Sequence, residues 1–149
     1  MTSQNRFSQI RDDLFLSDDE GLLNMEKIYF WLSSESYWAT DRDRETIQRS
    51  FDFSYPIGVY QGTRQVGVAR IVSDTATFAW LCDVFIDADF RGRGVGSWLV
   101  EASLKWAESN GVKRIILATR DAHDVYARQG FQPLKHPDYW MALDTRPQA

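Results

Sequence analysis

Residues 89–97, Asp-Phe-Arg-Gly-Arg-Gly-Val-Gly-Ser, combine three glycines and two arginines in one short run. A β-strand is predicted before this run, and an amphipathic helix is predicted to begin at Val95. The first N–H groups of a helix have no partner within the helix, and the helix dipole makes that end positive. Glycines carry no Cβ atom, so a ligand can approach these N–H groups closely. The run therefore has the chemistry of a phosphate or pyrophosphate site.

Two common phosphate motifs do not fit this run. A Walker A loop requires a lysine after its last glycine, and none follows here. The dinucleotide fingerprint G-x-G-x-x-G requires a third glycine where this chain has Ser97, and it normally follows the first strand of a mostly parallel sheet. The pattern that remains is R-x-x-G-x-G, which is met by Arg91, Gly94 and Gly96.

The elements that would position this run predict an α+β fold. Residues 1–24 are interpreted as a polar lead-in and residues 25–149 as a single domain. The patterns predict strands at 27–33, 56–60, 65–73, 77–86 and 113–119, helices from Asp41 or Asp43 to about Ser50 and at 95–109 and 123–129, and a final antiparallel arm of 131–134 with 139–143. Strand 113–119 follows a crossover helix, so it should run parallel to strand 77–86. We expect a mostly antiparallel sheet of six to seven strands with one central parallel pair, flanked by three to four helices.

Composition excludes several classes of function. A net charge of −4 argues against a nucleic-acid binder with a large basic surface. Cys82 is the only cysteine, so no internal disulfide can form, and the two histidines lie far from any metal-ligand spacing. There is no apolar stretch long enough to cross a membrane, and the N-terminus does not resemble a signal peptide. We expect a cytoplasmic protein without a metal.

Two segments carry a resemblance to a known family. The R-G-x-G-x-G turn and the later run 125–131, Val-Tyr-Ala-Arg-Gln-Gly-Phe, resemble motifs of the GNAT family of acetyl-CoA-dependent N-acetyltransferases, whose second motif is L-Y-x-x-x-G-F. The resemblance extends from about Lys27 to Leu143 and includes the order of strands. It implies a GNAT-like fold, acetyl-CoA as co-substrate, and direct acetyl transfer in a ternary complex to a primary amine of a small molecule. It also allows a homodimer.

The resemblance implies a set of residues that bind the cofactor. In such proteins the pantetheine arm pairs with the strand before the turn, a role that falls to Val84, Phe85 and Ile86. The pyrophosphate lies on the turn and the helix start, which implies contacts with Arg91, Gly92, Arg93, Gly94, Val95, Gly96 and Ser97. Asp121 stands near a position where relatives contact CoA, although it could simply cap the following helix.

The resemblance also assigns catalytic roles. Tyr126 matches a tyrosine that acts as general acid toward the departing thiolate. Many relatives carry a glutamate where this chain has Cys82, so the general base is open: Asp83, Glu35, a water chain, or an acceptor amine of low pKa. Asp83 is our first candidate, and its alternative role is a structural carboxylate that fixes a strand bulge or pairs with Arg70. Cys82 is interpreted as a small buried apolar residue.

Aromatic residues provide a hypothesis for the acceptor site. Tyr37, Trp38 and Trp80 lie on segments that surround the acceptor in the resembling fold, with Glu35 available for a cationic amine. The alternative is that these rings fill the core. A non-catalytic acyl-CoA-binding module is the alternative function, supported by the missing glutamate at Cys82. The sequence leaves the acceptor amine, its protein or metabolite nature, and the acyl-chain preference open.

Overall fold

The computed structural model describes residues 7–147 and contains one six-stranded sheet. The strands follow one another in chain order, and each neighbouring pair is antiparallel except the last, which is parallel. They are β1 (Ser8–Arg11), β2 (Leu14–Ser17), β3 (Tyr55–Gln61), β4 (Arg64–Ser73), β5 (Ala79–Ile86) and β6 (Ile115–Ile116). The predicted mixed sheet and its parallel pair are confirmed, but the pair lies at the edge of the described sheet rather than at its centre, because β6 is the last strand.

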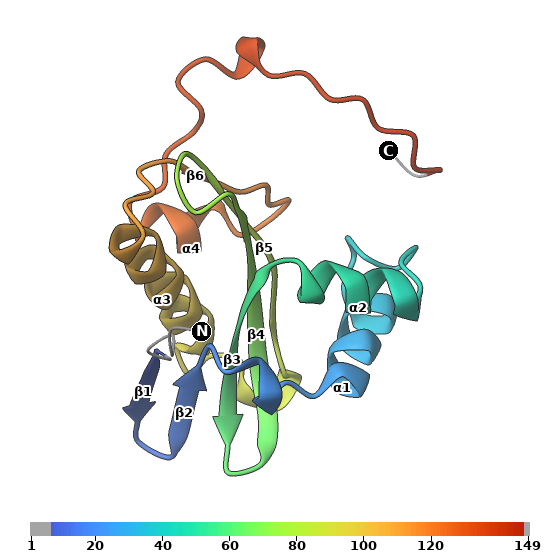
Figure 1. The fold of residues 1–149 in the computed structure, drawn as a ribbon, viewed down its shortest axis with the longest axis vertical. Helices are drawn as coiled ribbons and strands as arrows, with labels where there is room; N and C mark the ends of the chain where they lie inside the picture. The colour runs from blue at the N-terminus through green and yellow to red at the C-terminus, as the bar shows by residue number, and fades with distance from the viewer. Residues whose placement is uncertain (1–6, 148–149) are drawn as a thin grey trace.

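Helices cover both faces of this sheet (Figure 1). One face carries α1 (Met25–Phe30), which continues into a π-helical segment at Trp31–Glu35, and α2 (Arg44–Asp52). The other face carries α3 (Val95–Ser109) and α4 (His123–Ala127). Each face has its own apolar cluster, and Trp98 and Leu99 of α3 belong to the larger one. Strand β5 contributes residues to both clusters, which places it between the two layers.

The elements predicted from turn and capping signals are confirmed. The three-stranded meander β3–β4–β5 forms as expected, and α3 has the bounds predicted from its apolar face. Helix α2 begins directly after Asp43, one of the two candidate caps, and Oδ1 of Asp43 accepts a hydrogen bond from the Thr46 N–H at 2.8 Å.

The strand predicted at 27–33 is wrong, since this segment is helical. Asn24 caps α1 by accepting the Lys27 N–H at 3.1 Å. Ile28, Trp31 and Leu32 are buried together, and their spacing of three and four residues is helical rather than alternating. An Asn cap followed by that spacing indicates a helix. The alternation of aromatic and aliphatic residues in the same segment suggested a strand instead.

The described part of the polar lead-in, from residue 7 to residue 24, contains β1 and β2, which form a hairpin that joins the sheet. Leu16 lies opposite Val59 of β3 and is fully buried, as Leu14 nearly is. The interpretation of residues 1–6 lies outside the described residues. The four-residue strands were hidden by the polar residues around them, although Leu14 and Leu16 alternate with period two.

The predicted final antiparallel arm does not form. No strand occurs in the described part after β6, and β6 itself has two residues rather than the seven expected. Pro137 begins a short 3₁₀ turn, Pro137–Tyr139, which takes up part of the expected connection and the first residue of the predicted strand 139–143. Every residue from 132 to 147 is exposed, so this segment lies against no core.

Candidate functional site

The glycine turn leads from β5 into α3 and has the backbone shape that its glycines allow. Gly92 and Gly94 have φ of 79° and 78°, and a Cβ atom at either would meet nothing within 4 Å. Glycine is therefore favoured at both positions by the positive φ, and not by a neighbouring atom that a Cβ would contact. Gly94 caps α3 without a side-chain hydrogen bond, and the first helical turn has no acidic residue. The N–H groups at Val95, Gly96 and Ser97 thus form a helix start suited to an anion.

The edge of β5 next to this turn is open. β6 pairs with β5 only at Ala79–Ile115 and Trp80–Ile116, so no strand in the described part pairs with the β6-facing edge of β5 beyond Trp80. This places Val84, Phe85 and Ile86 on an unpaired stretch that ends at the glycine turn. Their side chains pack into the two cores, while their β6-facing backbone edge pairs with no described strand and is suited to an extended ligand, except that the Ile86 carbonyl oxygen accepts a hydrogen bond from Arg91.

The two arginines of the turn are anchored by protein contacts. Arg91 donates from Nε to the carbonyl oxygen of Ile86 at 3.2 Å, and its guanidinium lies over the ring of Phe85. Arg93 pairs with Asp13, in the β1–β2 turn, at 3.2 Å. The sequence did not indicate this partner, because it lies 80 residues away. Positive charge remains at the turn, although Asp13 partly neutralises it.

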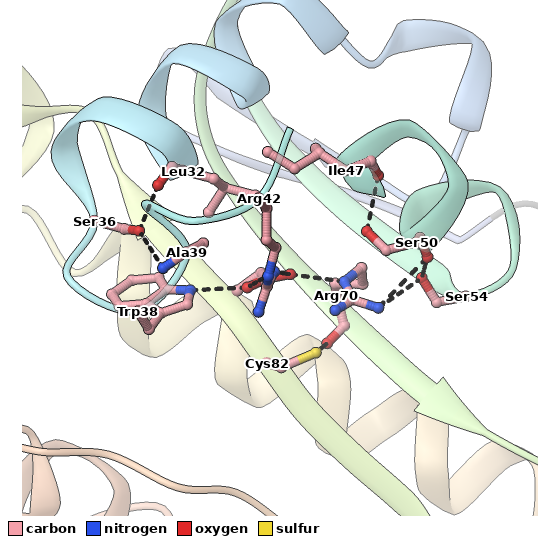
Figure 2. Close-up of polar contacts among 11 residues, drawn as sticks. Leu32, Ser36, Trp38, Ala39, Arg42, Ile47, Ser50, Ser54, Arg70 and Cys82 are labelled. Carbon is pink, nitrogen blue, oxygen red and sulfur yellow. Dashed lines mark hydrogen bonds and ion pairs between the residues drawn. The ribbon is translucent and has the colours of Figure 1, made fainter. Parts of the chain in front are cut away.

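Asp83 lies in a bulge of β5 and is fully surrounded by donors. Its φ is 52°, and the β4–β5 register shifts at this point. The side chain has no exposed surface, and its oxygens accept hydrogen bonds from Arg70 Nε at 2.8 Å, Arg42 Nη1 at 3.0 Å and Trp38 Nε1 at 2.8 Å. Figure 2 shows Trp38, Arg42 and Arg70 converging from the loop before α2 and from β4. We call these four residues the Asp83 cluster.

These contacts are those of a structural carboxylate. The sequence offered a second role for Asp83, that of a carboxylate at a strand bulge paired with Arg70. The observed contacts of Asp83 match that role. Both carboxylate oxygens accept hydrogen bonds, and Asp83 is the counter-charge of Arg70, whose side chain is 7% exposed. Arg42 and Trp38 were not predicted as its partners, because both lie more than 40 residues away and neither stands in a recognisable spacing.

Tyr37 and Trp38 lie together beside β5. Their rings make an edge contact with centroids 5.0 Å apart, and Trp38 lies 6.5 Å from Phe85. The Tyr37 hydroxyl accepts the backbone N–H of Arg120 at 3.0 Å, and the Arg120 guanidinium lies over the Tyr37 ring. The loop after the π-helical segment is therefore joined to the segment after β6.

The other two acceptor candidates lie apart from this pair. Glu35 is exposed at the end of the π-helical segment, and Trp80 is 39% exposed on β5 opposite Ile116. Within residues 7–147, neither makes a ring contact or hydrogen bond with Tyr37 or Trp38. The structure thus brings together two of the four predicted acceptor residues.

Tyr126 lies on α4, half-buried against the larger core. Its ring makes an edge contact with Phe131, with centroids 5.8 Å apart. Burial, with a smaller effect from nearby Tyr37, raises the pKa of the Tyr126 hydroxyl above its ordinary value. The hydroxyl therefore keeps its proton at neutral pH, as a proton donor must.

Asp121 and Cys82 are less suited to chemistry. Asp121 is exposed and pairs with its neighbour Arg120, whereas Thr119 accepts the Ala122 N–H just before α4. Cys82 is half-buried, and desolvation raises the pKa of its thiol to about 12. A thiol with that pKa is neither a nucleophile nor a base at neutral pH.

The described residues contain no group of histidine, cysteine and carboxylate side chains that could hold a metal ion. No described helix is both long and apolar enough to span a membrane. A surface hollow of about 770 Å³ lies between α1 and α2, lined by residues that include Met25, Tyr29 and Phe53. None of the predicted site residues lines that hollow.

Comparison with known proteins identifies the family. Residues 25–131 match the model of the acetyltransferase (GNAT) family, and this chain belongs to that family. A crystal structure from Xanthomonas campestris, assigned to the GNAT family, is 38% identical, covers 91% of this chain and 95% of its own, and superimposes with a TM-score of 0.85. A protein of Gibberella zeae named as an acetyltransferase is 28% identical, over 79% of this chain and 78% of its own.

More distant structures share the fold. The ribosomal-protein-S18-alanine N-acetyltransferase of Escherichia coli is 18% identical, with a TM-score of 0.67 over 80% of this chain and 77% of its own. Glucosamine-6-phosphate N-acetyltransferase of Arabidopsis thaliana is 15% identical, with a TM-score of 0.64 over 91% of this chain and all of its own. At these identities the likeness shows the fold alone.

Proposed function

We propose that this chain is a cytoplasmic enzyme that transfers an acetyl group from acetyl-CoA to a primary amine of a small molecule. The observation that carries the proposal is the R-x-x-G-x-G turn at the start of α3, directly beside the unpaired edge of β5. Membership of the acetyltransferase family supports acetyl-CoA as the donor. The N-acetyl specificity and the acceptor are our inference.

The donor would be held mainly by backbone groups. The N–H groups of Gly94 to Ser97 suit a pyrophosphate, and the edge of β5 at Val84 to Ile86 suits an extended amide-containing arm. Arg91 and Arg93 add positive charge at the turn. Asp121 is the weakest of the proposed cofactor contacts, because it is exposed and already paired with Arg120.

The acyl transfer requires two proton movements. The neutral amine attacks the thioester carbonyl, the carbon–sulfur bond breaks, and the departing thiolate takes the proton of the Tyr126 hydroxyl. The amine nitrogen loses its extra proton to water or to a protein base. Tyr126 suits the first movement, because burial keeps its hydroxyl protonated.

The second movement lacks an obvious protein base. Asp83 was our first candidate from the sequence, but its oxygens are occupied by Arg42, Arg70 and Trp38. For an alkylamine of pKa near 10.4, reaching the neutral form at pH 7 costs about 4–5 kcal/mol. We propose that the proton leaves through water, and that amines of low pKa are preferred. Rates across a series of amines should then rise as the amine pKa falls toward 7.

The acceptor would enter beside Tyr37 and Trp38, on the α1–α2 side of β5. The structural neighbours do not indicate one class of acceptor. The Escherichia coli protein is named for an alanine of a ribosomal protein, and the Arabidopsis protein is named for a sugar phosphate. We retain a small molecule as the proposal, with Glu35 and Trp80 as outer contacts.

The test is release of free thiol from acetyl-CoA in the presence of a panel of primary amines. The proposal predicts turnover with at least one amine, and a large loss in Tyr126→Phe. Tyr55→Phe is the matched control, because Tyr55 lies on β3 against Trp106, away from the glycine turn. Calorimetric binding of CoA without thiol release on any amine would instead support the alternative, a non-catalytic acyl-CoA-binding module.

A further inference from the structure

The segment between β6 and α4 is held to the proposed acceptor side of the protein by Tyr37. The Tyr37 hydroxyl accepts the backbone N–H of Arg120 at 3.0 Å, and the guanidinium carbon of Arg120 lies 3.8 Å from the centroid of the Tyr37 ring. These contacts join loop 36–43, which precedes α2, to residues 117–122, which precede α4. Among residues 7–147, no other hydrogen bond joins these two segments.

The chain between Arg120 and α4 is short and is itself hydrogen-bonded. Helix α4 begins at the third residue after Arg120. The Thr119 hydroxyl accepts the Ala122 N–H at 3.1 Å. The Ala122 carbonyl oxygen then accepts the Tyr126 N–H at 3.4 Å, in the first hydrogen-bonded turn of α4. The contact with Tyr37 therefore anchors the beginning of the helix that carries Tyr126.

The other end of α4 is anchored at the proposed donor site. The side-chain amide of Gln129, two residues beyond α4, donates to the carbonyl oxygen of Ser97 at 3.3 Å. Ser97 lies in the first turn of α3, next to the glycine turn. Helix α3 lies on the opposite face of the sheet from α1 and α2 (Figure 1). Helix α4 is thus connected to the acceptor loop before its beginning and to the donor site just after its end.

The direction of the Tyr126 hydroxyl depends on where α4 lies. In the described part of the chain this hydroxyl makes no hydrogen bond, and its ring is in edge contact with Phe131. Tyr37 lies near enough that, after burial, it contributes to raising the pKa of Tyr126. Since no polar contact within the chain directs the hydroxyl, the placement of α4 decides where it can deliver a proton.

We propose that Tyr37 is a positioning residue for Tyr126, and that its hydroxyl acts by holding the Arg120 N–H. Tyr37 itself transfers no proton in this account. The proposal rests on the proposed function, because it needs Tyr126 to be the acid that protonates the departing thiolate. The hydroxyl can be tested apart from the ring. Phenylalanine at position 37 retains the ring that contacts the Arg120 guanidinium and Trp38.

The first test needs no catalysis. Hydrogen exchange followed by NMR measures the protection of the Arg120 and Tyr126 amides, with amides of β4 as the reference for general stability. In Tyr37→Phe, both amides should exchange about fivefold faster, which is the scale of one lost hydrogen bond. Tyr29→Phe is the matched control, because Tyr29 lies under the Arg44 guanidinium at 4.5 Å on α1 and should leave both amides unchanged. Unchanged exchange at Tyr126 in Tyr37→Phe would overturn the proposal.

The second test is a double-mutant cycle in the thiol-release assay. Tyr37→Phe should lower kcat by about two- to fivefold and leave the KM for acetyl-CoA unchanged. Added to Tyr126→Phe, it should cause no further loss of kcat, because Tyr37 acts through Tyr126. Losses that multiply in the double variant would show that the Tyr37 hydroxyl acts on the substrate directly, and would contradict this inference alone. No thiol release by the wild-type protein with any amine would instead contradict the proposed function, and the role of Tyr126 with it.

Discussion

The glycine turn and the Asp83 cluster both lie on or next to β5, but their charged groups differ in exposure and in hydrogen bonding. At the turn, the helix start has no side-chain cap and the nearby guanidiniums are exposed. In the cluster, a fully buried carboxylate is enclosed by two guanidiniums and an indole N–H. The turn can therefore accept a ligand, whereas the cluster is already satisfied. Charge near a site indicates chemistry only where its hydrogen-bonding capacity is still free.

The difference assigns complementary tasks to the two regions. The Asp83 cluster connects the loop before α2 to β4 and β5. It also stabilises the bulge at Asp83, whose positive φ changes the direction of β5 just before the edge proposed to bind the donor. The glycine turn would provide the polar contacts of the proposed donor site. The cluster would thus position the site without touching the reacting atoms.

The largest expected effect is on stability, from Asp83→Asn. The amide cannot balance Arg70 and Arg42, so the free energy of unfolding should fall by about 3–5 kcal/mol. Chemical denaturation measures this as a lower midpoint. Asp121→Asn is the control, because that carboxylate is exposed and should leave the midpoint unchanged. A stable Asp83→Asn protein that binds CoA normally but lacks turnover would instead make Asp83 the catalytic base.

Removal of the Tyr126 hydroxyl should give the next largest effect. In Tyr126→Phe, kcat should fall about 100-fold, the scale of general acid catalysis, while CoA affinity stays unchanged. Steady-state kinetics and calorimetry on the same preparation separate the two quantities. Equal losses in Tyr126→Phe and Tyr55→Phe would exclude a specific role for Tyr126.

The pH profile sharpens the same prediction. Burial raises the pKa of the Tyr126 hydroxyl above its ordinary value, so this group loses its proton at higher pH than an exposed tyrosine does. The wild-type rate should therefore show no decrease from this group near pH 8. The same shift makes the contribution of Tyr126 to stability complete below pH 10 and lost as the pH rises further. A catalytic limb near pH 8 that disappears in Tyr126→Phe would contradict this assignment.

A pair of glycine substitutions tests the turn itself. Gly94 and Gly62 both have positive φ and both have free space around a Cβ atom, but Gly62 lies in the turn between β3 and β4. Alanine at either position should cost about 1–2 kcal/mol of stability. Only Gly94→Ala should also weaken CoA binding, by about tenfold in calorimetry. Equal CoA affinities in the two variants would separate the turn from the donor site.

The smallest effect is expected at Cys82. Its thiol pKa of about 12 keeps it protonated, so Cys82→Ala should change kcat less than twofold. Reaction of the wild-type thiol with iodoacetamide should be slow at pH 8, compared with free cysteine under the same conditions. Rapid alkylation coupled to loss of activity would show that Cys82 takes part in the reaction.

Features that depend on local sequence were predictable. The glycine turn, α3 and the meander follow from period, capping and turn residues within a few positions. The first helix was missed because an Asn24 cap and a helical spacing were concealed by alternating residue types. These are local signals, so a stricter comparison of the two periods would have found them.

Features that depend on contacts across the chain were not predictable. Asp83 meets Arg42 and Trp38 across more than 40 residues, and Arg93 meets Asp13 across 80. No spacing reports such pairs, so the sequence left Asp83 open between a catalytic base and a structural carboxylate paired with Arg70. Residues 139–143 show the same limit, because their apolar alternation predicted a strand that the described structure does not contain.

The crystal structure of the protein with CoA tests the central claim most directly. The account predicts pyrophosphate oxygens within hydrogen-bond distance of the N–H groups at 94–97, the pantetheine arm along the open edge of β5, and Asp83 still bound to Arg42 and Arg70. A structure with the pyrophosphate elsewhere, or with the Asp83 carboxylate released and facing the sulfur, would contradict it.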